Sequence, residues 1–252
     1  MKKSMLLGII VCIIAIVTMT AYGASPWPQF KGNAAHTGTV SHSIGCINTP
    51  EWTVELDKGG PFINGVLLDA DGNAIVLGIS GTLYSVSPSG AINWSLPGLG
   101  SGNWGGIAYS EDKDAIYATC FATSPEFYAI DNSTGQIVWN YNGAGGSDSA
   151  PVIGPDGTIY YTTYIDNNKI YALTDNGSSG SLKWSMDSPF AGYTCSSMPL
   201  YNDGSNNFIF HASEGVNAVG ENNVVCIRDD GTQGTIIWQN QVGYNWAEGA
   251  VD

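Results

Sequence analysis

A short segment that ends in tryptophan is repeated four times along this chain, and this repeat constrains the fold more than any other feature. In its clearest copy, residues 127–139, the run Phe-Tyr-Ala-Ile leads through a polar stretch and Gly135 to a second run that ends at Trp139. Apolar and aromatic runs of this length predict β-strands, and the Asn, Ser, Thr and Gly residues between them predict a turn. The segment is therefore a predicted β-hairpin.

All four copies share one spacing, in which a glycine precedes the tryptophan by four residues. The pairs are Gly90 and Trp94, Gly135 and Trp139, Gly180 and Trp184, and Gly234 and Trp238. The tryptophans are 45, 45 and 54 residues apart. A period of this length indicates an array of similar units, and hairpins that end in tryptophan are typical of propeller blades. We therefore predict an all-β fold, a β-propeller of four-stranded antiparallel blades with the tryptophans packed between blades.

The repeat places about four complete blades in the chain. They span about 60–96, 104–141, 148–186 and 195–241, and a further blade begins at 245–252. The strand around Trp52 resembles the outer strand of a blade whose inner strands would come from the C-terminus, so we expect an incomplete ring. In blade one, residues 69–73 begin like a calcium loop, but Ser80 stands at the twelfth position, where such a loop has a glutamate. We predict a hairpin turn there instead.

The first residues predict a secretory signal peptide, 1–23. Lys2 and Lys3 precede an apolar run from Met5 to about Met19, and Gly23 offers a cleavage site. The alternative is an uncleaved membrane anchor, but about 15 apolar residues are few for a membrane span. We expect an exported chain, periplasmic, cell-surface or secreted, with no stable membrane span after cleavage.

The charge of the chain is strongly acidic. It has 22 acidic residues against 8 basic ones, and two of the basic residues leave with the signal. Such a surface repels nucleic acid and anionic lipid, so we expect neither as a partner. The same charge also favours solubility.

The cysteines and histidines nominate no metal or haem site. Export permits disulfides among the four cysteines outside the signal, in three possible pairings that the sequence does not rank, and buried free thiols are an equally good interpretation for two of them. These cysteines are Cys46, Cys120, Cys195 and Cys226. The chain has no Cys-x-x-Cys motif. Its histidines, at positions 36, 42 and 211, are widely separated, and we expect His211 to be a half-buried strand residue.

The segment after the signal carries a resemblance to a known family. It contains Trp27-Pro28-x-Phe30-x-Gly32-Asn33 and, a little later, Thr37-Gly38. This resembles the opening of exported pyrroloquinoline quinone (PQQ)-like repeat propellers, and the segment from Tyr128 to Trp139 is similar to that family's blade motif. The resemblance covers most of 27–252. It implies an N-terminal extended segment at 24–49, a propeller at 50–252, and a ring of seven or eight blades in full.

Two functions are compatible with this resemblance. The favoured one is a non-catalytic binding or assembly scaffold without cofactors, similar to the outer-membrane assembly propellers of the family. The alternative is a quinoprotein dehydrogenase that oxidises alcohols or sugars with PQQ and calcium. That branch implies an adjacent cysteine pair and long insertions between blades, and the sequence has neither. Trp246 matches a stacking residue only by position, so we assign no catalytic, cofactor-binding or metal residue.

Propellers commonly bind ligands at one end of the central channel. We predict a protein or small-molecule ligand, of unknown identity, at the end formed by the loops that lead into each innermost strand, which we name the loop face. An aromatic ring with carboxylates there would suit a planar cofactor and a cation, and the alternative is that these polar loops face water. The residues of these loops are Asn103, Trp104, Ser147, Asp148, Tyr193, Cys195, Asn245, Trp246 and Glu248.

Overall fold

The computed structural model describes residues 28–38, 51–56, 65–100, 105–121, 124–164, 167–190, 197–212 and 224–240. They form sixteen β-strands in four separate sheets and one turn of 3-10 helix, η1 (Phe30–Gly32). Among these residues, no helix is long and apolar enough to cross a membrane. The signal predicted at 1–23 and the blade start predicted at 245–252 lie outside the described residues.

Each sheet is one blade of four antiparallel strands that pair in sequence order, which confirms the predicted fold class. Blade one contains β1 (Leu67–Leu68), β2 (Ala74–Leu77), β3 (Leu83–Val86) and β4 (Ile92–Leu96). Blade two contains β5 (Ile107–Ser110), β6 (Ala115–Thr119), β7 (Phe127–Asp131) and β8 (Ile137–Tyr141). Blade three contains β9 (Val152–Ile153), β10 (Ile159–Thr162), β11 (Lys169–Asp175) and β12 (Gly180–Asp187). Blade four contains β13 (Leu200–Asn202), β14 (Asn207–Ala212), β15 (Val224–Asp229) and β16 (Gly234–Asn240).

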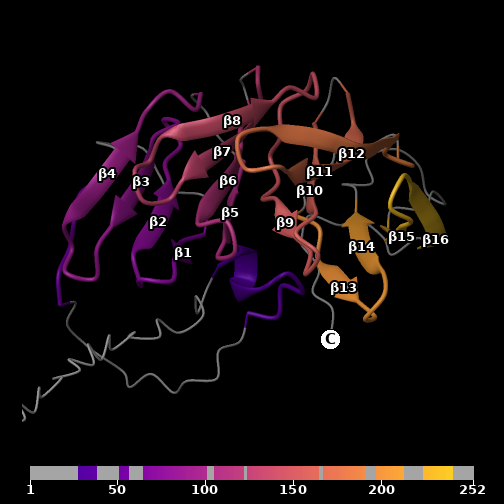
Figure 1. The fold of residues 1–252 in the computed structure, drawn as a ribbon, viewed down its shortest axis with the longest axis horizontal. Helices are drawn as coiled ribbons and strands as arrows, with labels where there is room; N and C mark the ends of the chain where they lie inside the picture. The colour runs from indigo at the N-terminus through magenta and orange to yellow at the C-terminus, as the bar shows by residue number, and fades with distance from the viewer. Residues whose placement is uncertain are drawn as a thin grey trace, which may run out of the picture.

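The blades lie side by side in an arc, with the first strand of each on the inner side and the last on the outer side (Figure 1). In such a meander successive links alternate between the two ends of the strands. The turns from first to second and from third to fourth strand therefore share one face, which we name the turn face. The remaining links form the loop face. The total of seven or eight blades stays a prediction.

The conserved spacing of glycine and tryptophan within each repeat has a packing cause. A tryptophan ring lies against the glycine of the next blade at four places, so that a Cβ added to that glycine would stand 2.4 to 3.0 Å from the nearest ring atom. The four tryptophans are Trp52, Trp94, Trp139 and Trp184. Gly180 leaves this space for Trp139, and Gly135, which also has a φ of 69°, leaves it for Trp94. Trp52 contacts Gly90 of blade one in the same manner. A side chain at any of these glycines would push neighbouring blades apart.

The indole N–H group of each of these tryptophans reaches the same place in the next blade. Trp52 donates to the carbonyl of Pro88 and Trp94 to that of Asn132, both at 2.7 Å. At the corresponding positions, Trp139 donates to Asp175 Oδ1 (3.1 Å), and Trp184 donates to Asp229 Oδ1 (2.8 Å). The pairing of third and fourth strands shifts register beside the residue opposite each tryptophan in all four blades. Such a bulge re-aims the side chain beside it.

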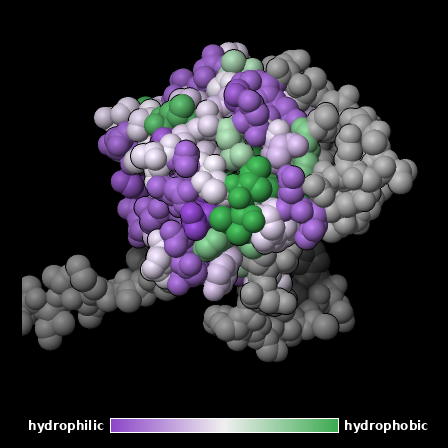
Figure 2. Space-filling model, turned by 90° about the vertical axis from the view of Figure 1, so that its right-hand side faces the viewer, coloured by the Kyte–Doolittle hydropathy of each residue, from purple (hydrophilic) through white to green (hydrophobic). Residues whose placement is uncertain are grey.

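The outer side of the arc is partly apolar. The residue two places before the tryptophan in each fourth strand is exposed in every blade. These residues are Ile92, Ile137, Leu182 and Ile236. Figure 2 shows an apolar patch on the side of the molecule that blade four forms, where Ile236, Ile237 and Trp238 are exposed.

The turn between β1 and β2 is a hairpin turn, as predicted. Asp69 is buried, and its Oδ1 accepts the backbone N–H groups of Asp71 (3.0 Å) and Asn73 (2.8 Å). Its Oδ2 accepts the Asn132 amide of blade two (3.0 Å). The carboxylate therefore joins two blades through hydrogen bonds.

Candidate functional site

The N-terminal segment 28–38 lies on the turn face, against the innermost strands of three blades (Figure 1). The Pro28 carbonyl accepts the N–H of Tyr109 in β5 (2.7 Å), and the Ala34 carbonyl accepts the N–H of Leu200 in β13 (2.8 Å). Between them, the amide of Gln29 accepts the N–H of Ile153 in β9 (2.9 Å) and donates to its carbonyl (3.4 Å). The Gln29 side-chain amide thus pairs with β9 as a peptide group would. The segment as a whole forms hydrogen bonds with the inner edges of three sheets.

The shape of this segment explains the motif that carries the family resemblance. Lys31, Gly32 and His36 have φ values of 51°, 91° and 58°, which fold the segment back on itself. The His36 ring is buried against Phe30, edge to face, with 5.3 Å between ring centroids. The amide of Asn33 exchanges hydrogen bonds with Thr37. The residues after Trp27, which itself lies outside the described part, therefore build a compact cover over the innermost strands of blades two to four.

An open groove of about 520 Å³, which we name the axial groove, lies between this cover and blades two to four. Its walls are mainly apolar, and its rim carries two acidic residues. The lining consists of Pro28, Gln29, Asn33, Ala34, Ala35, Tyr109, Ser110, Glu111, Asp112, Ile153, Gly154, Pro155, Leu200, Tyr201 and Asn202. Tyr201 is 48% exposed, and its ring contacts Phe208 with 6.2 Å between centroids. The groove thus offers an aromatic ring and aliphatic walls to a ligand.

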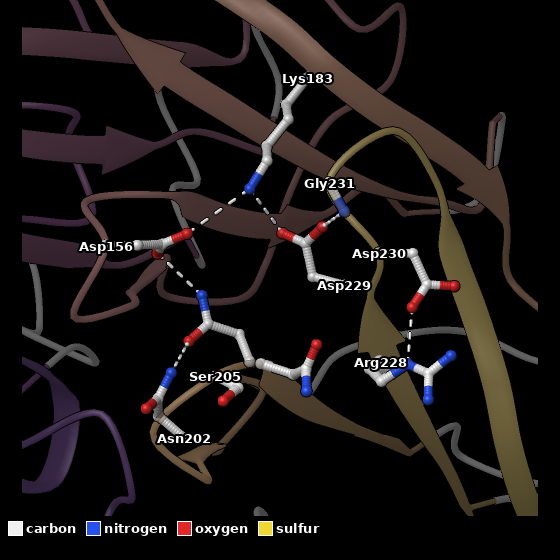
Figure 3. Close-up of a pocket in the computed structure, with 10 residues that line it drawn as sticks. Asp156, Lys183, Asn202, Ser205, Arg228, Asp229, Asp230 and Gly231 are labelled. Carbon is white, nitrogen blue, oxygen red and sulfur yellow. Dashed lines mark hydrogen bonds and ion pairs between the residues drawn. The ribbon is translucent and has the colours of Figure 1, made fainter.

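A second pocket, of about 450 Å³, lies between blades three and four and shares Asn202 with the groove (Figure 3). Its wall is a hydrogen-bonded clasp around Asp229, whose carboxylate is buried. Oδ2 of Asp229 accepts the Tyr160 hydroxyl (2.6 Å) and the Lys183 ammonium (2.9 Å), while Oδ1 accepts the Gly231 N–H (2.7 Å). Lys183 also lies 3.5 Å from Asp156. Lys183 and Asp229 therefore neutralise each other, and the bonds from Tyr160 and Lys183 to Asp229 join blades three and four.

Asp229 stays ionised in this environment. Burial alone would raise its pKa, but hydrogen bonds from Tyr160, Lys183, Gly231 and Trp184 hold the pKa below its ordinary value. The same arrangement recurs one blade earlier, where Asp175 accepts the Tyr117 hydroxyl (2.6 Å) and the Gly177 N–H (2.6 Å). The pattern is therefore a repeated joint between blades rather than a single reactive centre.

Most acidic residues that the structure describes lie on the turn face, in turns or at adjoining strand ends. They are Asp69, Asp71, Glu111, Asp112, Asp114, Asp131, Asp156, Asp175, Asp203, Asp229 and Asp230. Fewer basic residues accompany them there, namely Lys31, Lys113, Lys183 and Arg228. Charge of one sign gathered on one face produces a field that attracts cationic partners.

Most residues of the predicted ligand site on the loop face lie outside the described part of the chain. Only Ser147 and Asp148 lie within it. Ser147 is fully buried, with its N–H bonded to the carbonyl of Cys120 (3.0 Å) and its hydroxyl to that of Ser149 (3.4 Å). Ser147 is therefore not exposed on the loop face as expected, because it is buried and hydrogen-bonded to Cys120 of blade two. Ligand binding at this face stays a prediction.

The histidine and cysteine residues that the structure describes are buried. The predicted half-burial of His211 is wrong. Its ring is fully buried beside Phe190, with 5.6 Å between ring centroids. This burial lowers the pKa of His211 to about 3. Cys120 and Cys226 are both buried, whereas Cys46, Cys195 and His42 lie outside the described residues. Within the described ranges, no three His, Cys, Asp or Glu side chains are grouped to hold a metal ion.

One buried carboxylate near the loop face was not predicted from the sequence. Glu126 is fully buried between blades two and three, and its Oε1 accepts the N–H of Gly143 (2.5 Å) and the hydroxyl of Tyr161 (2.9 Å). Its Oε2 has no hydrogen-bond partner among the described residues. The position before β7 has no motif around it, and only the tertiary contacts show its burial.

The stability of the protein should depend on pH through Glu126. Burial raises its pKa above the ordinary 4.5, against the opposing effect of the bond from Gly143. The folded state therefore binds this proton more tightly than the unfolded state, so the stabilisation is complete below pH 4.5 and is lost as the pH rises through the folded pKa. Urea unfolding of wild type and Glu126→Gln should show a wild-type stability that falls relative to the variant across this range. Parallel pH profiles would contradict this assignment, and Asp187→Asn, at an exposed carboxylate, is the control.

Comparisons with known proteins agree with this architecture. Residues 79–250 match a PQQ-like repeat family whose model is described as outer membrane protein assembly factor BamB. The fold is similar to BamB from Moraxella catarrhalis, at 18% identity and a TM-score of 0.52, over 73% of this chain and 50% of that one. It is also similar to the quinohemoprotein alcohol dehydrogenase from Comamonas testosteroni, at 15% identity and a TM-score of 0.60, over 89% of this chain and 42% of that one.

A second quinohemoprotein alcohol dehydrogenase, ADHIIG from Pseudomonas putida HK5, has a TM-score of 0.61 at 11% identity, over 86% of this chain and 40% of that one. The chain thus spans half or less of the length of these three proteins. Identities this low show the shared fold. The curated proteins contain no match to this sequence.

Proposed function

Since this chain belongs to the PQQ-like repeat propeller family described as outer membrane protein assembly factor BamB, we propose that it is an exported, non-catalytic scaffold that binds a partner protein on its turn face. The axial groove beside Tyr201 is the observation that carries this proposal. The signal pattern at 1–23 supports export, and the name of the family supports a role in assembly.

The chemistry of the groove suits a protein surface. Protein interfaces are typically centred on aromatic and aliphatic residues inside a polar rim. Here Tyr201, Ile153 and Leu200 supply aromatic and aliphatic lining, and the same lining includes the exposed Glu111 and Asp112. Tyrosine is among the residues that most often contribute strongly to binding, so we expect Tyr201 to contact the partner directly.

The joints between blades suit a scaffold. The carboxylates of Asp175 and Asp229 each hold a tyrosine and a tryptophan of the preceding blade. Side chains fixed in this way hold the turns that surround the groove in one arrangement. A preorganised surface binds with a smaller loss of conformational entropy than a mobile one.

Site-directed cross-linking tests the proposal. The exported full chain would carry a photoreactive amino acid at position 201 or, as a control of similar exposure on the outer side, at position 137. We expect a discrete cross-linked protein from position 201 alone. After identification and purification, that protein should bind Tyr201→Ser about 30-fold more weakly than wild type, because loss of a central aromatic residue costs about 2 kcal/mol.

Two outcomes would contradict the scaffold function. The first is equal cross-linking from both positions, or none from either. The second is stoichiometric binding of PQQ with calcium by the full chain, together with dye-linked oxidation of an alcohol or sugar. That result would favour the quinoprotein dehydrogenase alternative.

A further inference from the structure

The axial groove combines apolar walls with a rim of one charge. Glu111 and Asp112 are exposed residues of its lining, and among the described residues that line it there is no Lys, Arg or His. In the turn of residues 111–114, the three acidic residues outnumber Lys113. Beyond Asn202, the next turn presents the exposed Asp203. A ligand in the groove therefore lies in a negative field.

The charge discriminates among possible occupants. A second copy of this chain would bring a net charge of −14 and the same acidic turns. Anionic polymers and acidic peptides would meet like charges at the rim. Like-charge contacts at an interface disfavour the wrong partner, whereas complementary charges accelerate and orient the right one.

The walls define the central contact. Ile153, Leu200 and Tyr201 present aliphatic and aromatic surface inside a volume of about 520 Å³. Burial of apolar surface there contributes about 25 cal/mol per Å² to the free energy of binding, before the costs of association. An aromatic or large aliphatic side chain therefore suits the centre, and positive charges suit the positions on either side.

We infer that the axial groove binds a basic segment of a partner protein, with one apolar side chain in the groove and lysine or arginine residues beside Glu111 and Asp112. This inference rests on the proposed scaffold function and specifies the chemistry of its partner. It names a class of segment that can be tested before the partner itself is identified.

Three fluorescent synthetic peptides of equal length test the inference by anisotropy against the full chain. The first has a central tryptophan with two lysines on each side, the second replaces the lysines with glutamates, and the third replaces the tryptophan with glycine. We expect binding of the first peptide, about tenfold weaker binding of the third, and none of the second.

Two double variants of the protein locate the contact. Glu111→Lys with Asp112→Lys should raise the Kd of the first peptide about tenfold. Glu51→Lys with Glu55→Lys changes the net charge equally, but on the segment that contacts the β3–β4 turn through Trp52. It should change the Kd less than about twofold at physiological salt, because charges beyond a Debye length are screened. All four positions are exposed, and circular dichroism would verify folding.

The outcomes separate this inference from the scaffold function. Equal weakening by both double variants, preference for the glutamate peptide, or no binding of the lysine peptide at about 1 mM would overturn the basic-segment inference. If position 201 still captures a partner in that case, the scaffold function stands alone. If the peptide binds as expected but position 201 captures no protein, the chemistry of the groove stands and the scaffold function falls.

Discussion

Replacement of Trp139 by alanine should lower the free energy of unfolding by about 3–5 kcal/mol, the usual cost of removing a large aromatic side chain from a core. Trp139 is 6% exposed and stacks on Phe127, with 5.7 Å between ring centroids. Its indole N–H bonds to Asp175, and its ring fills the space left by Gly180. The substitution would leave a cavity between blades two and three and remove one donor from the Asp175 carboxylate.

The same repeat position in blade four provides a matched control. Trp238 is 41% exposed, and Phe210 lies 6.0 Å from it between ring centroids. Trp238→Ala should therefore cost about 1 kcal/mol or less, because surface substitutions disturb little packing. Urea unfolding followed by circular dichroism would measure both variants. Equal losses of unfolding free energy in the two variants would contradict the expected contribution of Trp139 to the packing between blades two and three.

Replacement of Asp229 by alanine should destabilise the protein by a similar amount, about 3–5 kcal/mol, because it removes one partner from a buried ion pair. Tyr160, Trp184 and Lys183 would each lose an acceptor at the joint between blades three and four. Lys183 keeps Thr158 and Asp156 as neighbours, so part of its charge remains compensated. Asp230→Ala is the control, since that exposed carboxylate pairs with Arg228 at the surface, where such pairs contribute little.

Acid should test the same joint independently. The folded-state pKa of Asp229 lies below its ordinary value of 3.8, so its stabilisation is complete above that pH and is lost as the pH falls through the folded pKa. The stability of Asp229→Asn should therefore vary less with pH in this acidic range than that of the wild type. An unchanged acid dependence in the variant would mean that other carboxylates account for acid unfolding.

The repeat could be predicted from the sequence because it depends on interactions between residues that are close together in the chain. Apolar runs, turn residues and the spacing of Gly135 and Trp139 predicted the hairpins, the antiparallel blades and the packing of tryptophan between blades. The turn at Asp69 was predicted from its place between two strand patterns, after the absence of a glutamate at the twelfth position had argued against a calcium loop. The hairpins, the blades and the turn each lie within one repeat, where sequence separation is small and strand geometry fixes the partners. The packing of tryptophan between blades was predicted from its recurrence at a fixed place in the repeat.

The site could not be predicted in this way. The expectation of a ligand site rested on the loop face, yet Ser147 is buried there, and the two pockets described above lie on the turn face. A polar residue in a loop has the same sequence signature whether it faces a channel or folds beneath the next blade. His211 and Glu126 are fully buried for the same reason, since their surroundings come from other strands and loops.

By itself, the sequence determined the all-β blade architecture, the repeat period and the fixed spacing of glycine and tryptophan in each repeat. Only the tertiary structure decided that Gln29 pairs with β9, that Asp229 joins two blades and that Tyr201 stands beside an open groove. Those contacts join residues far apart in the chain, and burial and hydrogen bonding become defined only when the blades pack.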